Sequence, residues 1–170
     1  TTNYIHDHPV FGVSIGVESE GEMIAGVVYL PVLDETYAAS KGDGATVNGE
    51  SISVSDSDEL PSSLLATGFP YDEELVPKSL ELFSDLVRES RGIRRVGAAS
   101  VDLAFVAAGK YDGFWELGLA PWDVAAGSLI VEEAGGCVTD FYGESHNLYE
   151  SQGIIATNGN FHKDMIEKLS

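Results

Sequence analysis

The segment from residue 120 to residue 136 constrains the fold most, because it carries signals for both ends of one helix. Pro121 suits the first helical position, since its fixed φ matches a helix start and its missing N–H is not needed there. Gly135 and Gly136 are typical of a helix end. The small residues at 125–127 allow close packing. The sequence therefore predicts a helix that begins at Pro121 and stops at Gly135, with Asp123 in its first turn.

Asp123 and Glu116 flank one strand-to-helix connection. Residues 111–118 have the aromatic content of a short strand that ends near Glu116. In the first turn of a helix, free N–H groups and the helix dipole already favour a carboxylate, so Asp123 has a purely structural explanation. The strand-to-helix crevice, however, is where α/β folds bind ligands. The pair therefore predicts a site in which Asp123 holds a cation.

Composition limits the classes of protein that fit. The chain has 170 residues and 44% hydrophobic residues, enough for one packed domain. No apolar run has the length of a membrane span, and the single cysteine, Cys137, has no partner for an internal disulfide. With no leader segment at the start, these features predict a cytoplasmic protein that does not bind membranes.

The net charge of −19, from 28 acidic and 9 basic residues, argues against nucleic acid as a partner, because nucleic-acid binding requires basic surface. Such an acidic surface has two explanations, adaptation to high salt or an ordinary acidic protein, and both stay open. All four arginines fall within residues 88–95: Arg88, Arg91, Arg94 and Arg95. Clustered guanidinium groups in an anionic protein predict an anionic ligand, with phosphate the usual match.

The order of predicted elements indicates a layered α/β protein. Extended segments at 10–17, 23–29, 35–40 and 51–54 with tight turns between them predict an antiparallel sheet over residues 1–55. From residue 64 onward, strands and helices alternate, which predicts a mainly parallel sheet over residues 64–170. Strands are expected at 64–67, 93–96, 111–118, 137 and 153–157. Helices are expected at 73–90, 99–108, from 121 to the stop at Gly135, and from 160. We expect a single domain over 1–170.

The turn Gly97-Ala98-Ala99-Ser100 opens one of these helices with small residues. Exposed N–H groups at a helix start can receive an anion or a hydroxyl. A plain strand-to-helix turn would have the same sequence, so the turn by itself is weak evidence for a site.

Several stretches, in order along essentially the whole chain, resemble the inositol monophosphatase family. They are Thr1-Thr2-Asn3 followed by Pro9–Ile15, then Ala66–Pro70, Gly97–Ala99, and Trp122–Gly127 with Glu133–Gly136, the last being the family's C-terminal signature. The resemblance implies Mg²⁺-dependent hydrolysis of phosphate monoesters in a layered αβαβα fold, usually as a homodimer. In that mechanism, metal ions polarise the phosphoryl group and lower the pKa of the attacking water.

Residue roles follow from the same resemblance. Thr1 matches the threonine that ends the Asp-Pro-Ile-Asp-Gly-Thr motif and orients the attacking water, and Asp123 matches the late aspartate that ligates metal and touches substrate. Glu116 matches a glutamate that binds substrate hydroxyls. The remaining expected substrate contacts are Thr2, Arg94, Gly97, Ala98 and Ala99, with Arg94 less certain because Arg95 is adjacent. The family's other metal ligands, a glutamate and two aspartates, are expected before Thr1 and do not occur in these residues.

Two hypotheses follow for function. The first is a Mg²⁺-dependent phosphatase for a small polyol or sugar phosphate, of the inositol monophosphate or fructose 1,6-bisphosphate type, with a nucleotide-type substrate also open. On this hypothesis, the 170-residue chain alone is expected to be inactive, because one sure metal ligand does not make a metal site. The second is a non-catalytic fragment that acts as a dimerisation or binding module.

Overall fold

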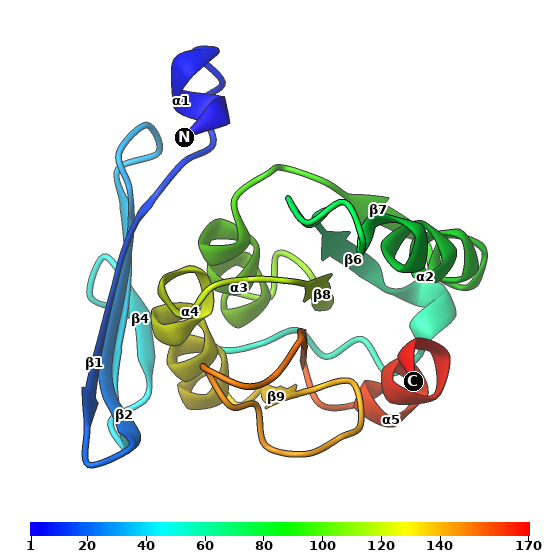
Figure 1. Ribbon diagram of the computed structural model, residues 1–170. Helices are drawn as coiled ribbons and strands as arrows, with labels where there is room; N and C mark the ends of the chain where they lie inside the picture. Colours follow the sequence, from blue (N-terminus) through cyan, green and yellow to red (C-terminus); the bar gives the residue numbers. More distant parts are fainter.

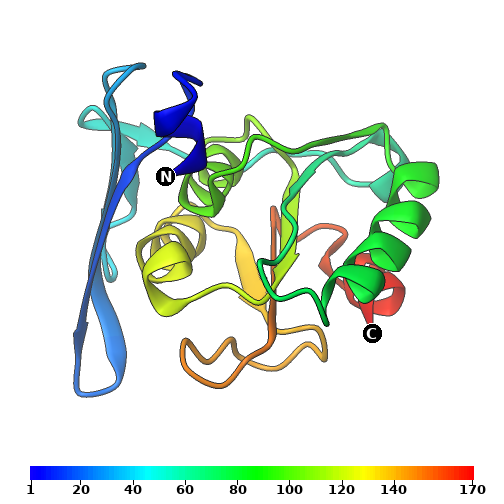
Figure 2. The same cartoon turned by 45° about the horizontal axis from the view of Figure 1, so that its top comes forward.

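The computed structural model describes all residues from 1 to 170 and shows four layers, in the order sheet, helices, sheet, helices (Figure 1). The first sheet contains β1 to β5, and the second has the strand order β7-β6-β8-β10-β9. Helices α3 and α4 lie between the two sheets, and α2 and α5 cover the far side of the second sheet (Figure 2). The predicted α/β layering is confirmed.

The first sheet is an antiparallel meander, as predicted. Its strands are β1 (Val13–Ser19), β2 (Glu22–Leu30), β3 (Glu35–Ser40), β4 (Ala45–Val47) and β5 (Glu50–Ile52). One short helix, α1 (Thr2–Ile5), precedes the sheet and was not predicted. The expected strand over 10–17 begins at Val13 instead.

The second sheet is mixed, whereas a mainly parallel sheet was expected. Its strands are β6 (Leu64–Thr67), β7 (Gly92–Arg94), β8 (Gly113–Leu117), β9 (Cys137–Thr139) and β10 (Gly153–Thr157). Strand β6 pairs in parallel with β7 and β8, but β10 pairs antiparallel with both β8 and β9. Strands β9 and β10 are joined by a loop with no helix, and chain reversal without a crossover gives antiparallel pairing. The expectation of a mainly parallel sheet was therefore wrong for β10.

The helices agree closely with their sequence signals. They are α2 (Val76–Glu89), α3 (Ala99–Ala107), α4 (Pro121–Glu133) and α5 (His162–Leu169), and a 3-10 turn spans Leu60–Ser62. Pro121 is the first residue of α4, and Gly135 adopts a positive φ of 88° just beyond its end. None of the helices combines the length and hydrophobicity needed to cross a lipid bilayer.

Glycines bring α4 and the first sheet into close contact. A Cβ at Gly26 would lie 2.8 Å from the backbone oxygen of Ala126, and one at Gly16 would lie 3.0 Å from Cβ of Ala125. On the opposite side of α4, Gly127 packs against Leu103 of α3. The small residues of the 125–127 segment thus let α4 pack closely between the sheet and α3, as the sequence indicated.

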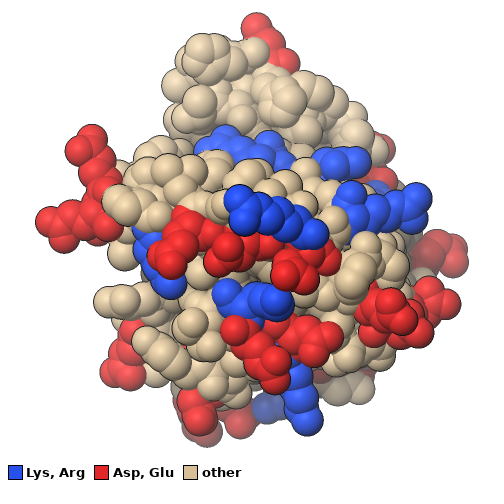
Figure 3. Space-filling model, turned by 90° about the vertical axis from the view of Figure 1, so that its right-hand side faces the viewer, with Lys and Arg blue, Asp and Glu red and all other residues tan.

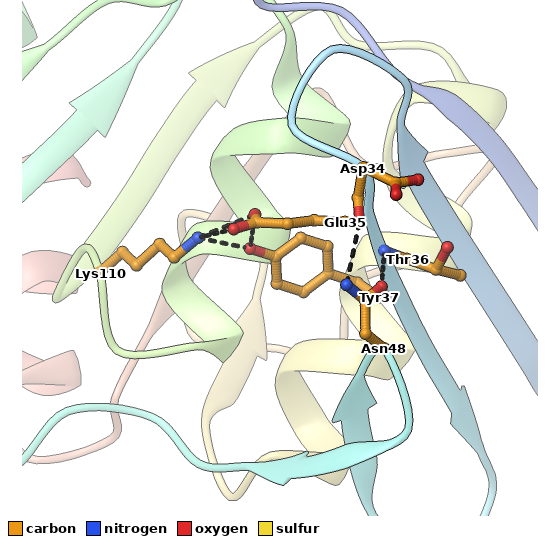
Figure 4. A network of polar contacts seen from close by, with 6 residues as sticks. All are labelled: Asp34, Glu35, Thr36, Tyr37, Asn48 and Lys110. Carbon is orange, nitrogen blue, oxygen red and sulfur yellow. Dashed lines mark hydrogen bonds and ion pairs between the residues drawn. The ribbon is translucent and has the colours of Figure 1, made fainter.

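A polar network joins the first sheet to the segment after α3 (Figure 4). Lys110 Nζ donates to the Glu35 carboxylate at 2.9 and 3.0 Å and to Tyr37 Oη at 2.8 Å. The same ammonium lies 4.6 Å from the ring centre of Phe105. Burial raises the pKa of Glu35, but the hydrogen bonds from Lys110 and Tyr37 outweigh it, so this pKa lies below its usual value. The network fixes the position of the first sheet relative to α3.

The outer helical layer carries mixed charge. Acidic and basic side chains alternate on the face seen in Figure 3, where α2 and α5 lie. Lys78 pairs with Glu81 at 3.6 Å, and Lys168 pairs with Glu89 at 3.0 Å. These pairs are exposed, so each contributes little to stability.

Candidate functional site

A cleft of about 240 Å³ opens where the ends of β6 and β8 meet the starts of α3 and α4. Five segments that are distant in sequence line it: the N-terminal segment, the end of β6, the β7–α3 connection, the end of β8 and the first turn of α4. The lining residues include Thr1, Asn3, Gly12, Gly68, Phe69, Arg95, Gly97, Ala98, Ala99, Ser100, Glu116 and Asp123.

Most of the residues singled out in the sequence meet in this cleft. Thr1, Gly97, Ala98, Ala99, Glu116 and Asp123 all line it. Two residues do not. Thr2 is exposed and does not line the cleft, and Arg94 is exposed and donates to its own neighbour, the carbonyl of Ile93, at 3.3 Å. Arg95 faces the cleft in place of Arg94.

Asp123 is held at the start of α4 by the backbone. Its Oδ2 accepts a hydrogen bond of 3.0 Å from the N–H of Ala120, the residue that precedes the helix. This contact satisfies one of the free N–H groups at the helix start and fixes the carboxylate at the edge of the cleft. This geometry therefore fits both explanations of Asp123: a carboxylate favoured at the start of a helix, and a carboxylate that holds a cation.

Glu116 is 8% exposed and lies near the end of β8. Burial raises the pKa of Glu116 to about 7, while Arg95 lowers it and Asp123 raises it further. Both protonation forms are therefore populated near neutral pH. A carboxyl group in this state can donate a hydrogen bond to a hydroxyl group or accept one from it.

The turn before α3 presents backbone N–H groups to the cleft. Gly97 has a φ of 83°, which favours glycine, and Ala98 precedes the first helical residue. The first N–H groups of a helix have no partner within it, and here they lie among the lining residues. Arg95 adds the positive charge, with its guanidinium 5.9 Å from the ring centre of Phe69. An anion or a polar hydroxyl suits this end of the cleft.

Asn3 is a site residue that was not predicted. Its Nδ2 donates to the carbonyl of Val10 at 2.6 Å and to that of Val96 at 2.8 Å. These two bonds tie the N-terminal segment to the β7–α3 connection and place Thr1 beside the cleft. Sequence reasoning could have found Asn3 only through its position in the Thr1-Thr2-Asn3 stretch, because its partners are distant backbone groups.

Metal ligands are few in these residues. No three His, Cys, Asp or Glu side chains converge on one point, and Glu116 and Asp123 are the two carboxylates that line the cleft. Magnesium takes several oxygen ligands, and two ions acting on one phosphate need a cluster of carboxylates. The donor set of this chain is therefore too small to form a magnesium site by itself.

Comparison with known proteins identifies the family. The sequence profile of the inositol monophosphatase family matches residues 1–170. The Nus factor SuhB of Pseudomonas aeruginosa is 47% identical over 99% of this chain, and the chain spans 63% of that relative's length. Among solved structures, an inositol monophosphatase from Anabaena (Nostoc) sp. PCC 7120 has a TM-score of 0.96 at 45% identity, with 99% of this chain and 67% of that chain covered.

A further structure, SaIMPase-II of Staphylococcus aureus, is described as bound to inositol monophosphate. Its TM-score is 0.86 at 28% identity, with 97% of this chain and 64% of that chain covered. The profile match over every residue and the agreement with these structures lead to one conclusion: this chain belongs to the inositol monophosphatase family.

Proposed function

We propose that the protein of which this chain forms a part hydrolyses the phosphate monoester of a small polyol or sugar. One observation carries the proposal. The cleft brings the Arg95 guanidinium, the backbone N–H groups at the start of α3 and the buried Glu116 carboxyl group into one small volume, which matches a phosphate on a hydroxylated ring.

Each group has a role in this proposal. Arg95 and the N–H groups of the Gly97 turn bind the phosphate or a second anionic group, because guanidinium and helix-start N–H groups both favour oxyanions. Glu116 contacts substrate hydroxyls. Thr1 lies where it can orient a water molecule. The inositol monophosphate named for SaIMPase-II supports this substrate class, and fructose 1,6-bisphosphate and nucleotides stay open as alternatives.

In this chain, Asp123 is the one residue that we propose as a magnesium ligand. Its carboxylate is fixed at the cleft and provides one oxygen ligand of the kind that Mg²⁺ prefers. The relatives are longer than this chain, and we propose that their additional residues contribute the missing carboxylates. On this proposal, the complete protein is active as a homodimer, and the 170 residues alone bind Mg²⁺ weakly.

The test is phosphate release by the complete protein at saturating Mg²⁺. Asp123→Asn should lower kcat by orders of magnitude, because it removes a metal-binding charge and keeps the shape of the side chain. Asp140→Asn is the matched control: Asp140 Oδ1 also accepts backbone N–H groups, from Tyr142 and Glu144, but lies outside the cleft. Near-normal turnover by Asp123→Asn would contradict the metal-ligand role.

A binding module is the second candidate function. Relatives at 42–47% identity carry the name Nus factor, which does not describe hydrolysis. In this chain, Val13, Ile15 and Val17 form an apolar row on the outer face of the edge strand β1, each 45–58% exposed. Exposed apolar rows of this kind mark interaction surfaces. Self-association of the purified chain without any phosphatase activity of the complete protein would favour this candidate over the first.

A further inference from the structure

The Glu116 carboxylate occupies the space that a side chain at position 68 would need. A Cβ built on Gly68 would overlap all three atoms of the carboxylate group. Gly68 does not have a positive φ, so its backbone conformation is open to alanine. Alanine at this position would therefore displace the Glu116 carboxylate without straining the backbone, unlike at Gly97, where the φ of 83° also matters.

The second sheet explains why these two residues meet. Thr67 pairs with Trp115 in the parallel β6–β8 ladder, and Thr67 Oγ1 donates to the carbonyl of Trp115 at 2.7 Å. Gly68 and Glu116 each follow one member of this pair. Both members are 2% exposed, so they form a tightly packed support for the two residues that follow. The space beside Gly68 that holds the carboxylate, called the slot below, thus lies directly after the end of β6 and beside the last residues of β8.

The groups around Glu116 come from three further elements. Asp102 of α3 is 1% exposed, and burial, followed by the neighbouring Glu116 charge, raises its pKa well above the usual value. Burial therefore favours the neutral form of the Asp102 carboxyl group. Arg95 and Asp123 are the charged groups that act on Glu116 from the β7–α3 connection and from α4. None of these groups donates a hydrogen bond that would fix the Glu116 carboxylate, so its placement depends on the slot.

We propose that Gly68 is a positioning residue that determines which substrate hydroxyl Glu116 can reach. The inference rests on the proposed function, in which Glu116 contacts the hydroxyl groups of a polyol phosphate. A side chain at position 68 would turn the carboxylate out of its slot into the 240 Å³ cleft, where the polyol ring would lie. Gly68 therefore favours ring substrates with a hydroxyl group that can reach the Glu116 carboxylate while it lies in the slot.

The kinetic test uses the complete protein and two esters, inositol monophosphate and p-nitrophenyl phosphate, which has no hydroxyl groups. Gly68→Ala should raise KM for inositol monophosphate about 10- to 100-fold, the loss expected for a hydrogen bond to a charged group. KM for p-nitrophenyl phosphate should rise clearly less, because that ester has no hydroxyl contact to lose; equal increases for the two esters would contradict the proposal. Gly92→Ala is the control, since its new Cβ would meet only ordinary contacts at 3.6 and 3.8 Å.

A double variant separates positioning from general damage. Glu116→Asp shortens the side chain by one methylene and vacates the slot, so adding Gly68→Ala to it should cost nothing further. Effects that instead add fully would show that the two residues act independently, which would overturn the proposal.

A third measurement remains informative if the complete protein hydrolyses neither ester and the proposed function fails. The titration midpoint of the Glu116 carboxyl carbon can be followed by NMR in metal-free protein. Gly68→Ala should lower this midpoint from about 7 towards the ordinary glutamate value, because the carboxylate moves into water. Gly92→Ala should leave it unchanged. An unchanged midpoint in Gly68→Ala would show that the slot does not hold the carboxylate.

Discussion

Asp102→Asn should make the protein more stable, and increasingly so as the pH rises from the acid range. Asp102 is 1% exposed, and its Oδ1 has no hydrogen-bond partner. Burial and the Glu116 charge raise the pKa of Asp102 well above its usual value in the folded state. In the unfolded chain, the same carboxyl group has the pKa of a model peptide, about 3.9. Folding therefore retains a proton that the unfolded chain releases.

The sign and size of the effect follow from proton linkage. A folded pKa above the unfolded pKa means that the contribution to stability is fully present below the unfolded pKa and is lost as the pH rises towards the folded pKa. Within that window, the loss is about 1.4 kcal/mol per pH unit. Asparagine carries no titrating group, so this loss is absent from the variant. The difference in unfolding free energy between Asp102→Asn and the unsubstituted protein should therefore grow between about pH 4 and about pH 5, with a slope of at most about 1.4 kcal/mol per pH unit.

Urea unfolding at the two pH values measures this difference. Ser79→Ala is the control, because Ser79 Oγ is also buried without a partner but does not titrate. Its effect on stability should be the same at both pH values. A difference for Asp102→Asn that is flat with pH would refute the reasoning, since it would mean that Asp102 is ionised or partnered in the folded protein. If the difference grows as expected, the buried Asp102 lowers the stability of the folded protein as the pH rises.

Two further substitutions test the packing that positions the site. Lys110→Met should lower the unfolding free energy by about 1–2 kcal/mol, because it removes the hydrogen bonds to Glu35 and Tyr37 and the contact with Phe105; the pair is partly exposed, which keeps the effect modest. Urea unfolding would measure it, and a loss near zero would mean that the network adds nothing to stability. Gly26→Ala should cost about 1–3 kcal/mol, because the new Cβ would lie 2.8 Å from the rigid backbone of α4. The same measurement with Gly92→Ala as control checks this, and equal stabilities would contradict the close contact.

The sequence determined the elements whose signals are local. Helix α4 begins at Pro121 and ends before Gly135, as predicted, because proline and glycine act through their own backbone angles. The position of Asp123 in the first turn followed from the same signals. The meander of the first sheet could be predicted because its turns and strands alternate along the chain. Resemblance to a family added the expected roles of Glu116 and of the Gly97 turn, and the cleft brings both together.

The tertiary structure decided the rest, because those features depend on residues that are distant in sequence. Arg95 faces the cleft in place of Arg94, since successive side chains of an extended segment point in opposite directions and the sequence does not fix which one faces inward. The antiparallel insertion of β10 depends on a loop whose path has no local signal. The slot at Gly68 and the burial of Asp102 arise only where β6, β8 and α3 pack together. Local backbone preferences are written in the sequence, whereas the environment of each carboxyl group exists only once the layers are assembled.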